Sequence, residues 1–122
     1  MINQTRTLRL PNSLLLVQDS AAAEPPDSFS GRLITASPTC IAIGTLSEAD
    51  GETTVRLVDS NERALPALEE FVGELDTPSR YILVSTVDGQ EIMRQLVEEA
   101  KVRVRIYVSH SVEPDDVAVV IG

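Results

Sequence analysis

The sequence contains a single cysteine, Cys40. One thiol excludes a disulfide within the chain and is typical of a reducing compartment. The stretch MINQTRTLRLPN at the start lacks the apolar segment of a secretory signal, and an aliphatic run such as SLLLV at 13–17 is far too short to span a membrane. These absences predict a soluble, cytoplasmic protein that does not associate with a membrane.

Aromatic residues are also scarce, at 3% of the 122 residues, and tryptophan is absent. We therefore expect a core of valine, leucine, isoleucine and alanine. Hydrophobic residues at 43% and charged residues at 24% are close to the globular average, which excludes wholesale disorder. The length predicts one domain over residues 1–122, with a long loop at 20–31, where Pro25 and Pro26 lie.

Positively charged residues are also few. One lysine and nine arginines stand against 19 acidic residues, which gives a formal net charge of −9. An acidic surface repels nucleic acid and anionic lipid, and it attracts a basic protein. The charge balance predicts a protein partner or self-association, and no binding to nucleic acid.

Recognisable cofactor motifs are missing. The chain has neither the G-x-G-x-x-G nor the G-x-x-x-x-G-K-[ST] pattern of phosphate-binding loops. It also lacks the spaced cysteine and histidine ligands of zinc sites and the carboxylate ladder of calcium loops. We expect no cofactor and no metal.

The first half of the chain has the pattern of antiparallel β-structure. Apolar and polar residues alternate in short runs rich in valine, isoleucine and threonine, separated by turn residues. The expected strands are 5–10, 13–19, 32–36, 40–46 and 53–59. Neighbouring strands are expected to pair as hairpins, most clearly 40–46 with 53–59, where Asp50-Gly51 supplies turn geometry.

The second half changes period. Apolar residues spaced three and four apart predict amphipathic helices at 65–75 and 88–101, and strands are expected at 80–87, 102–109 and 116–122. Strand, helix and strand over 80–109 indicate a βαβ-like unit. The predicted fold class is α+β, with a mixed, mainly antiparallel sheet of seven to eight strands and two helices.

A basic stripe is the leading candidate for a binding site. In an extended chain, Lys101, Arg103, Arg105 and Tyr107 point to one side, opposite Val102, Val104, Ile106 and Val108. The cations are either neutralised by acidic residues on neighbouring strands or meet an acidic partner, such as a second copy of the chain.

Three further residues carry groups that could do chemistry. His110 has serine and carboxylate neighbours in SHSVEPDD, which is suited either to a solvated loop or to acid–base catalysis, and Asp115 in the same loop is a candidate oxygen ligand. Cys40 begins an apolar strand and is either a buried thiol or a reactive one. The turn 85–89 precedes a predicted helix, where ligands often bind.

The function favoured by these patterns is protein–protein binding, as an adaptor, an inhibitor or an immunity-type neutraliser. The support is the acidity, the size of one domain and the lack of a catalytic constellation. One alternative is an enzyme or small-ligand sensor that uses His110 near the strand ends at 85–89 or 109–116. A second is a self-associating structural domain built by edge-strand pairing.

Overall fold

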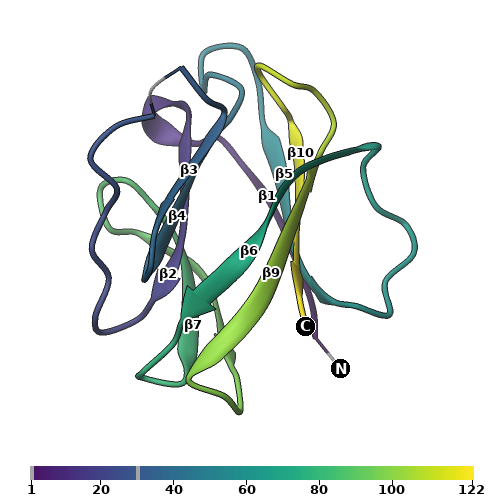
Figure 1. Cartoon of the computed structure of the whole chain (residues 1–122). Helices are drawn as coiled ribbons and strands as arrows, with labels where there is room; N and C mark the ends of the chain where they lie inside the picture. Colours follow the sequence, from purple (N-terminus) through teal and green to yellow (C-terminus); the bar gives the residue numbers. More distant parts are fainter. Residues whose placement is uncertain (1, 30) are drawn as a thin grey trace.

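Short alternating runs rich in β-branched residues form ten β-strands arranged as two sheets packed face to face (Figure 1). The structure is a computed structural model that describes residues 2–29 and 31–122. Within those residues there is no α-helix, and the only helical turn is the 3-10 turn η1 (Pro11–Ser13). None of the described segments forms a helix long and apolar enough to cross a membrane.

Sheet A has the strand order β1-β5-β10-β9-β6. Its strands are β1 (Asn3–Leu8), β5 (Thr53–Asp59), β10 (Asp116–Ile121), β9 (Lys101–Val108) and β6 (Leu68–Asp76). Neighbouring strands are antiparallel except for β5 and β10, which run parallel.

Sheet B has the order β3-β4-β2-β7-β8, and all of its pairs are antiparallel. Its strands are β3 (Ile34–Ser37), β4 (Cys40–Gly44), β2 (Leu14–Asp19), β7 (Tyr81–Thr86) and β8 (Glu91–Leu96).

The main core lies between the two sheets and confirms the expected aliphatic composition. Every second residue of each central strand points inward. The largest fully buried side chains include Leu15, Ile41, Ile43, Leu57, Ile82 and Ile106. Each such side chain contributes about 1.5–3 kcal/mol of transfer free energy relative to exposure, so alternation along the strands stabilises the sandwich.

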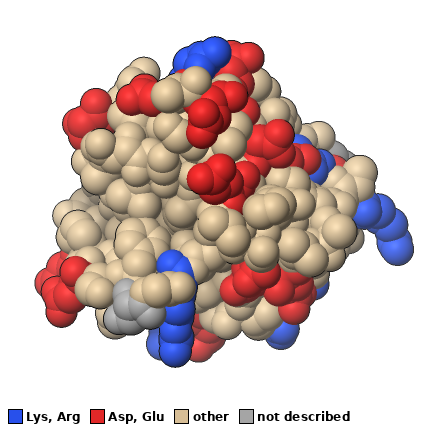
Figure 2. Space-filling view, turned by 90° about the horizontal axis from the view of Figure 1, so that it is seen from above, with Lys and Arg blue, Asp and Glu red and all other residues tan. Residues whose placement is uncertain are grey.

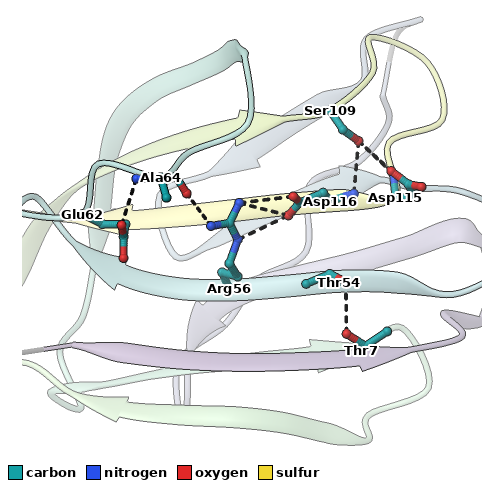
Figure 3. Close-up of polar contacts among 8 residues, drawn as sticks. All are labelled: Thr7, Thr54, Arg56, Glu62, Ala64, Ser109, Asp115 and Asp116. Atoms are coloured by element: carbon teal, nitrogen blue, oxygen red, sulfur yellow. Dashed lines mark hydrogen bonds and ion pairs between the residues drawn. The ribbon is translucent and has the colours of Figure 1, made fainter.

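Segment 60–67, between β5 and β6, lies over the outer face of sheet A. Arg56 on β5 donates to the carboxylate of Asp116 on β10 at 3.2–3.3 Å and to the carbonyl oxygen of Ala64 (Figure 3). The backbone N–H groups of Ala64 and Arg63 donate to Glu62 at 2.9 and 2.8 Å and lower the pKa of its carboxyl. Three buried residues lie on this outward side of the sheet: Val58, Ala118 and Val120.

The predicted long loop at 20–31 lies against sheet B in its described residues. Phe29 packs against a small cluster of Leu16, Cys40 and Ala42 on the outer face of the sheet. The hydroxyl of Ser37 donates to the carbonyl oxygen of Glu24, and the N–H of Glu24 donates to the Thr39 hydroxyl at 2.9 Å. The loop therefore covers the β3 side of sheet B.

A buried carboxylate joins two loops at the end of the sandwich that is lower in Figure 1. Asp19, at 0% exposure, accepts hydrogen bonds from the N–H groups of Ala21 and Ala22 and from both the N–H and the hydroxyl of Ser79. Burial alone raises the pKa of Asp19, but these four hydrogen bonds outweigh it, and the net shift is downward. Asp19 therefore joins the loop after β2 to the loop before β7.

The predicted α+β class is wrong, because the protein is all-β. The segment expected as a helix at 65–75 overlaps β6, and the one at 88–101 contains β8. Each strand takes part in a pairing that is interrupted by a β-bulge. The register of β6 with β9 shifts between Glu69 and Phe71, and the register of β7 with β8 shifts between Val84 and Ser85. A bulge breaks strict alternation. Ile92 and Met93 are consequently adjacent and both buried, which resembles a helical stripe.

The βαβ-like unit at 80–109 is also wrong. β7 and β8 form an antiparallel hairpin in sheet B, and β9 belongs to sheet A. The hairpin turn is closed by Thr86, whose carbonyl oxygen accepts from Gly89 N–H at 3.1 Å and whose hydroxyl accepts from Gln90 N–H at 3.0 Å. Gly89 has φ +90°, a conformation that favours glycine at this turn.

Some expected hairpins are wrong although their strands are present. β4 and β5 lie in different sheets, as do β1 and β2, so the connections at 45–52 and 9–13 cross between sheets. The β3–β4 hairpin is confirmed. Local patterns predict extended backbone, whereas the partner of each strand depends on packing between distant residues.

Candidate protein-binding surface

The loops at the upper end of the sandwich form one connected surface. The N–H of Leu46 donates to the carbonyl oxygen of Pro114 at 2.9 Å, and the N–H of Thr45 donates to the carbonyl oxygen of Ser13 at 2.8 Å. The Arg9 guanidinium donates to the carbonyl oxygen of Glu48. These contacts join the β4–β5 loop, the β9–β10 loop and the η1 turn.

This loop end carries a group of exposed carboxylates. They are Glu48, Asp50, Glu52, Glu113 and Asp115. Figure 2 views this end and shows acidic side chains spread across it, with most basic side chains near the margin. Carboxylates gathered on one face attract a cationic partner over a range set by ionic strength. We call these five residues the loop-end carboxylates.

The β9–β10 loop is held in one conformation by its own side chains. The Ser109 hydroxyl donates to Asp115 at 2.9 Å and accepts from the N–H groups of Asp115 and Asp116 at 3.1 Å each (Figure 3). Nδ1 of His110 accepts from the N–H groups of Val112 and Glu113 at 3.1 and 3.2 Å. The loop is therefore pre-organised.

Val112 lies at the tip of this loop with 66% of its surface exposed. A cleft of about 380 Å³ lies beside it and is lined by both apolar and polar residues, among them Leu14, Phe29 and Arg32. An exposed apolar residue on a loop held by its own hydrogen bonds, next to a cleft and at an end of the sandwich that carries five exposed carboxylates, resembles the apolar centre and charged surroundings of a protein interface. Sequence reasoning missed Val112, although the motif SHSVEPDD marked the loop.

The geometry gives His110 and Asp115 structural contacts within the loop. Both residues are exposed. The Ser109 hydroxyl is engaged with Asp115 and Asp116, and no hydrogen bond joins it to the imidazole among the described contacts. The same residues contain no group of three or more histidine, cysteine or carboxylate side chains placed to hold a metal. A catalytic role for His110 stays a hypothesis.

Cys40 is fully buried on the outer face of sheet B. Its thiol lies 3.5 Å from the side-chain oxygen of Gln18, and burial raises its pKa to about 11. A thiol with this pKa stays protonated near neutral pH and is a poor nucleophile.

The predicted basic stripe lies on the outer face of sheet A, beside the acidic strand β6. Nζ of Lys101 lies 3.6 Å from Asp76. The hydroxyl of Tyr107 donates to Glu69 at 2.7 Å, and this hydrogen bond is the main reason that the pKa of Tyr107 is raised. Arg105 donates to the same hydroxyl at 3.3 Å.

Arg103 differs from its neighbours in the stripe. It lies opposite Glu74 in the β6–β9 register, yet its side chain has no ion pair or hydrogen bond with a described residue. Three of the four stripe residues therefore already have partners within the chain. Binding of an outside partner by this stripe stays a prediction.

Comparison with known proteins adds information at the level of the fold. No family model matches the chain, and no curated protein matches it in sequence. A solved structure described as ComJ, inhibitor of the DNA-degrading activity of NucA, from Bacillus subtilis superposes with a TM-score of 0.71 over 97% of this chain and 93% of that one.

The fold is similar to that of ComJ. Sequence identity to ComJ is 7%, so the likeness establishes the fold alone. A second solved structure, described as crocagin biosynthetic gene J, has a TM-score of 0.59 at 13% identity and covers 98% of this chain and 94% of that one. ComJ itself is described as an inhibitor of a nuclease.

Proposed function

We propose that this protein binds and neutralises a cationic protein of the nuclease class. The observation that carries the proposal is the likeness to ComJ, which extends over nearly the whole of both chains. The net charge of −9 supports it independently. Enzymes that bind DNA do so largely through cationic groups, which an acidic protein attracts as well.

In this proposal the loop-end carboxylates steer the encounter, and Val112 supplies the apolar anchor. Clustered charges of one sign raise association rates at low salt, whereas desolvated apolar contacts at the centre of an interface slow dissociation. The pre-organised β9–β10 loop lowers the entropic cost of binding, because its conformation is already fixed by Ser109 and His110.

The test uses DNA degradation as its readout. Extract of the source organism is separated by cation exchange, and each fraction is assayed on plasmid DNA with increasing amounts of the purified protein. We expect at least one nuclease fraction to be inhibited to saturation, with half-inhibition moving to higher protein concentration between 50 and 300 mM salt. If no nuclease fraction responds at either salt, the proposal is overturned.

Two matched variants locate the surface. The triple variant E48Q/D50N/E113Q removes three loop-end charges from side chains without a hydrogen bond in the described structure. The control E24Q/E98Q/E99Q removes three exposed charges at the opposite end. We expect about tenfold weaker inhibition from the first variant at 50 mM salt and less than twofold change from the control. Equal effects would contradict the proposed surface.

A further inference from the structure

The two sheets have four edge strands: β1 and β6 in sheet A, and β3 and β8 in sheet B. An exposed edge presents unpaired backbone N–H and C=O groups to which another strand can bind. On one side of the sandwich, the Gln4 side chain of β1 donates to the carbonyl oxygen of Arg94 on β8 at 2.9 Å and to the side chain of Gln95 at 3.1 Å. This bridge joins β1 to β8.

The edge of β3 is covered by the 20–31 loop, through the contacts of Glu24 with Ser37 and Thr39. A cleft between residues 24–28 and 35–37 follows the same edge. Described side-chain contacts therefore lie across parts of the β1, β8 and β3 edges. The β6 edge has one described backbone contact, at Asp76.

The open part of β6 is identified by its hydrogen-bond directions. The N–H of Asp76 donates to the carbonyl oxygen of Pro38 at 2.8 Å, so it points away from β9. Backbone direction alternates along a strand, so the N–H and C=O groups of Glu74 and Val72 also point away from β9. These groups have no backbone partner outside the ladder among the described residues.

A cleft of about 500 Å³ lies between β6 and β3. Glu70 and Phe71 line one wall, and residues 32–36 line the other. Below the cleft, the contact between Asp76 and Pro38 closes the gap between the two sheets. The edge of β6 thus has room beside Glu70 and Phe71, next to Val72.

Charge favours one kind of occupant. The side chains of Glu70 and Glu74 are exposed and have no ion pair or hydrogen bond among the described residues. On its other side β6 already pairs with β9, a strand that places cations on the outer face and aliphatic residues on the inner face. A second copy of β6 would instead bring glutamates against glutamates, which is destabilising.

We propose that the β6 edge is a docking site for an extended basic segment of another protein, which adds to sheet A as a sixth strand next to Val72 and Glu74. Main-chain hydrogen bonds to those two residues supply the binding, and the carboxylates of Glu74 and Glu70, on either side of Val72, favour arginine or lysine in the segment. The residues between the cations face Phe71 and the cleft. The cleft beside β6 adjoins the loop-end cleft, with which it shares Arg32, Leu33 and Ser111. The inference rests on the β6 edge and does not depend on the proposed function.

The geometry predicts which backbone groups of the segment matter. In an antiparallel pair, directly opposite residues place their side chains on the same face, and a residue opposite Glu74 or Val72 turns its own N–H toward β6. A basic residue there shares the outer face with Glu74. The N–H groups of the basic residues are therefore the ones that bind, and those of the intervening residues point away.

The test is a titration of the full chain with a fluorescent peptide of alternating arginine and valine, followed by anisotropy at 50 mM salt. We expect saturable binding that weakens at least tenfold when the arginines are N-methylated, and less than threefold when the valines are. No saturable binding, or equal effects of the two methylation patterns, overturns the proposal.

Protein variants complete the test. We expect E70Q/E74Q to weaken peptide binding about tenfold, and E98Q/E99Q, which removes the same charge from an exposed loop, to leave it within twofold. Equal weakening by both variants would show binding by net charge alone and would overturn the proposal. A dimer in sedimentation together with no saturable peptide binding would overturn it as well, with a second copy on β6 as the alternative occupant.

Discussion

The two ends of the sandwich use carboxylates in opposite ways. At the lower end, Asp19 is fully buried and accepts four hydrogen bonds that join two loops. At the upper end, the loop-end carboxylates project into solvent, and Glu48, Asp50 and Glu113 have no side-chain partner among the described contacts. The same chemical group stabilises the fold in one place and is available to a partner in the other, and burial with satisfied hydrogen bonds separates the two roles.

The largest effect is expected from Asp19→Ala. The substitution leaves the hydroxyl and N–H groups of Ser79 and the N–H groups of Ala21 and Ala22 without their acceptor. We expect a loss of about 3 kcal/mol in the free energy of unfolding, measured by urea titration. Asp50→Asn is the control and should stay within about 0.5 kcal/mol of the wild type. Equal effects would contradict the distinction between the ends.

The pH dependence of stability tests the same carboxylate. The pKa of Asp19 is lowered in the folded protein, so the unfolded chain binds its proton first as the solution is acidified. Its contribution is fully present above about pH 4 and is lost as the pH falls through the lower folded pKa. We expect Asp19→Asn to lose stability less steeply than the wild type below about pH 4. Parallel curves would contradict a lowered pKa.

A smaller effect is expected for Ser79→Ala, which removes the hydroxyl that donates to Asp19 at 2.7 Å but keeps the backbone donor. We expect a loss of about 1.5 kcal/mol, at the lower end of the range for one hydrogen bond to a charged group. Ser111→Ala, at an exposed residue of the loop end, is the matched control for urea unfolding. A loss of unfolding free energy as large as that of Asp19→Ala would show that the Ser79 hydroxyl alone accounts for the stabilisation by Asp19.

The loop end should respond in the opposite direction. E48Q/D50N/E113Q removes like charges that repel one another, so we expect it to raise the unfolding free energy by a few tenths of a kcal/mol at low salt. The gain should vanish in about 0.5 M salt, where screening acts over only a few ångströms. Destabilisation at low salt would show that these carboxylates have a structural role like that of Asp19.

The sequence predicts where the backbone is extended better than it predicts what each strand pairs with. The strand expected at 53–59 is β5 at Thr53–Asp59, and the one at 13–19 contains β2 at Leu14–Asp19. Alternation of side chains is a local signal. The assignment of neighbouring strands to different sheets depends on distant contacts such as the parallel pairing of β5 with β10, and no short window contains it.

The helices were mispredicted for a specific reason. In β6, Phe71 and Leu75 are inward-facing residues four apart, and the bulge at Glu69 and Phe71 shifts Leu68 out of simple alternation. The result has the spacing of a helical stripe. A residue-by-residue pattern cannot distinguish a bulged strand from an amphipathic helix of similar length.

Only part of the candidate site can be predicted from the sequence. The motif SHSVEPDD marked the β9–β10 loop, but it suggested His110 as a reactive group, whereas its Nδ1 accepts two backbone N–H groups. The exposure of Val112 is a property of the folded loop, since valine in a sequence usually indicates burial. The open edge of β6 is likewise visible only once the strand order is known.

The position of β10 has a consequence for how the molecule is made. The tenth strand in sequence lies between β5 and β9, inside sheet A. A ribosome that has released β1 to β9 has therefore delivered two separate ribbons, β1 with β5 and β9 with β6, which only the last strand can join. Sheet A is completed only after β10 has been translated, and until then the aliphatic inner residues of β5 and β9 lack the strand that lies between them.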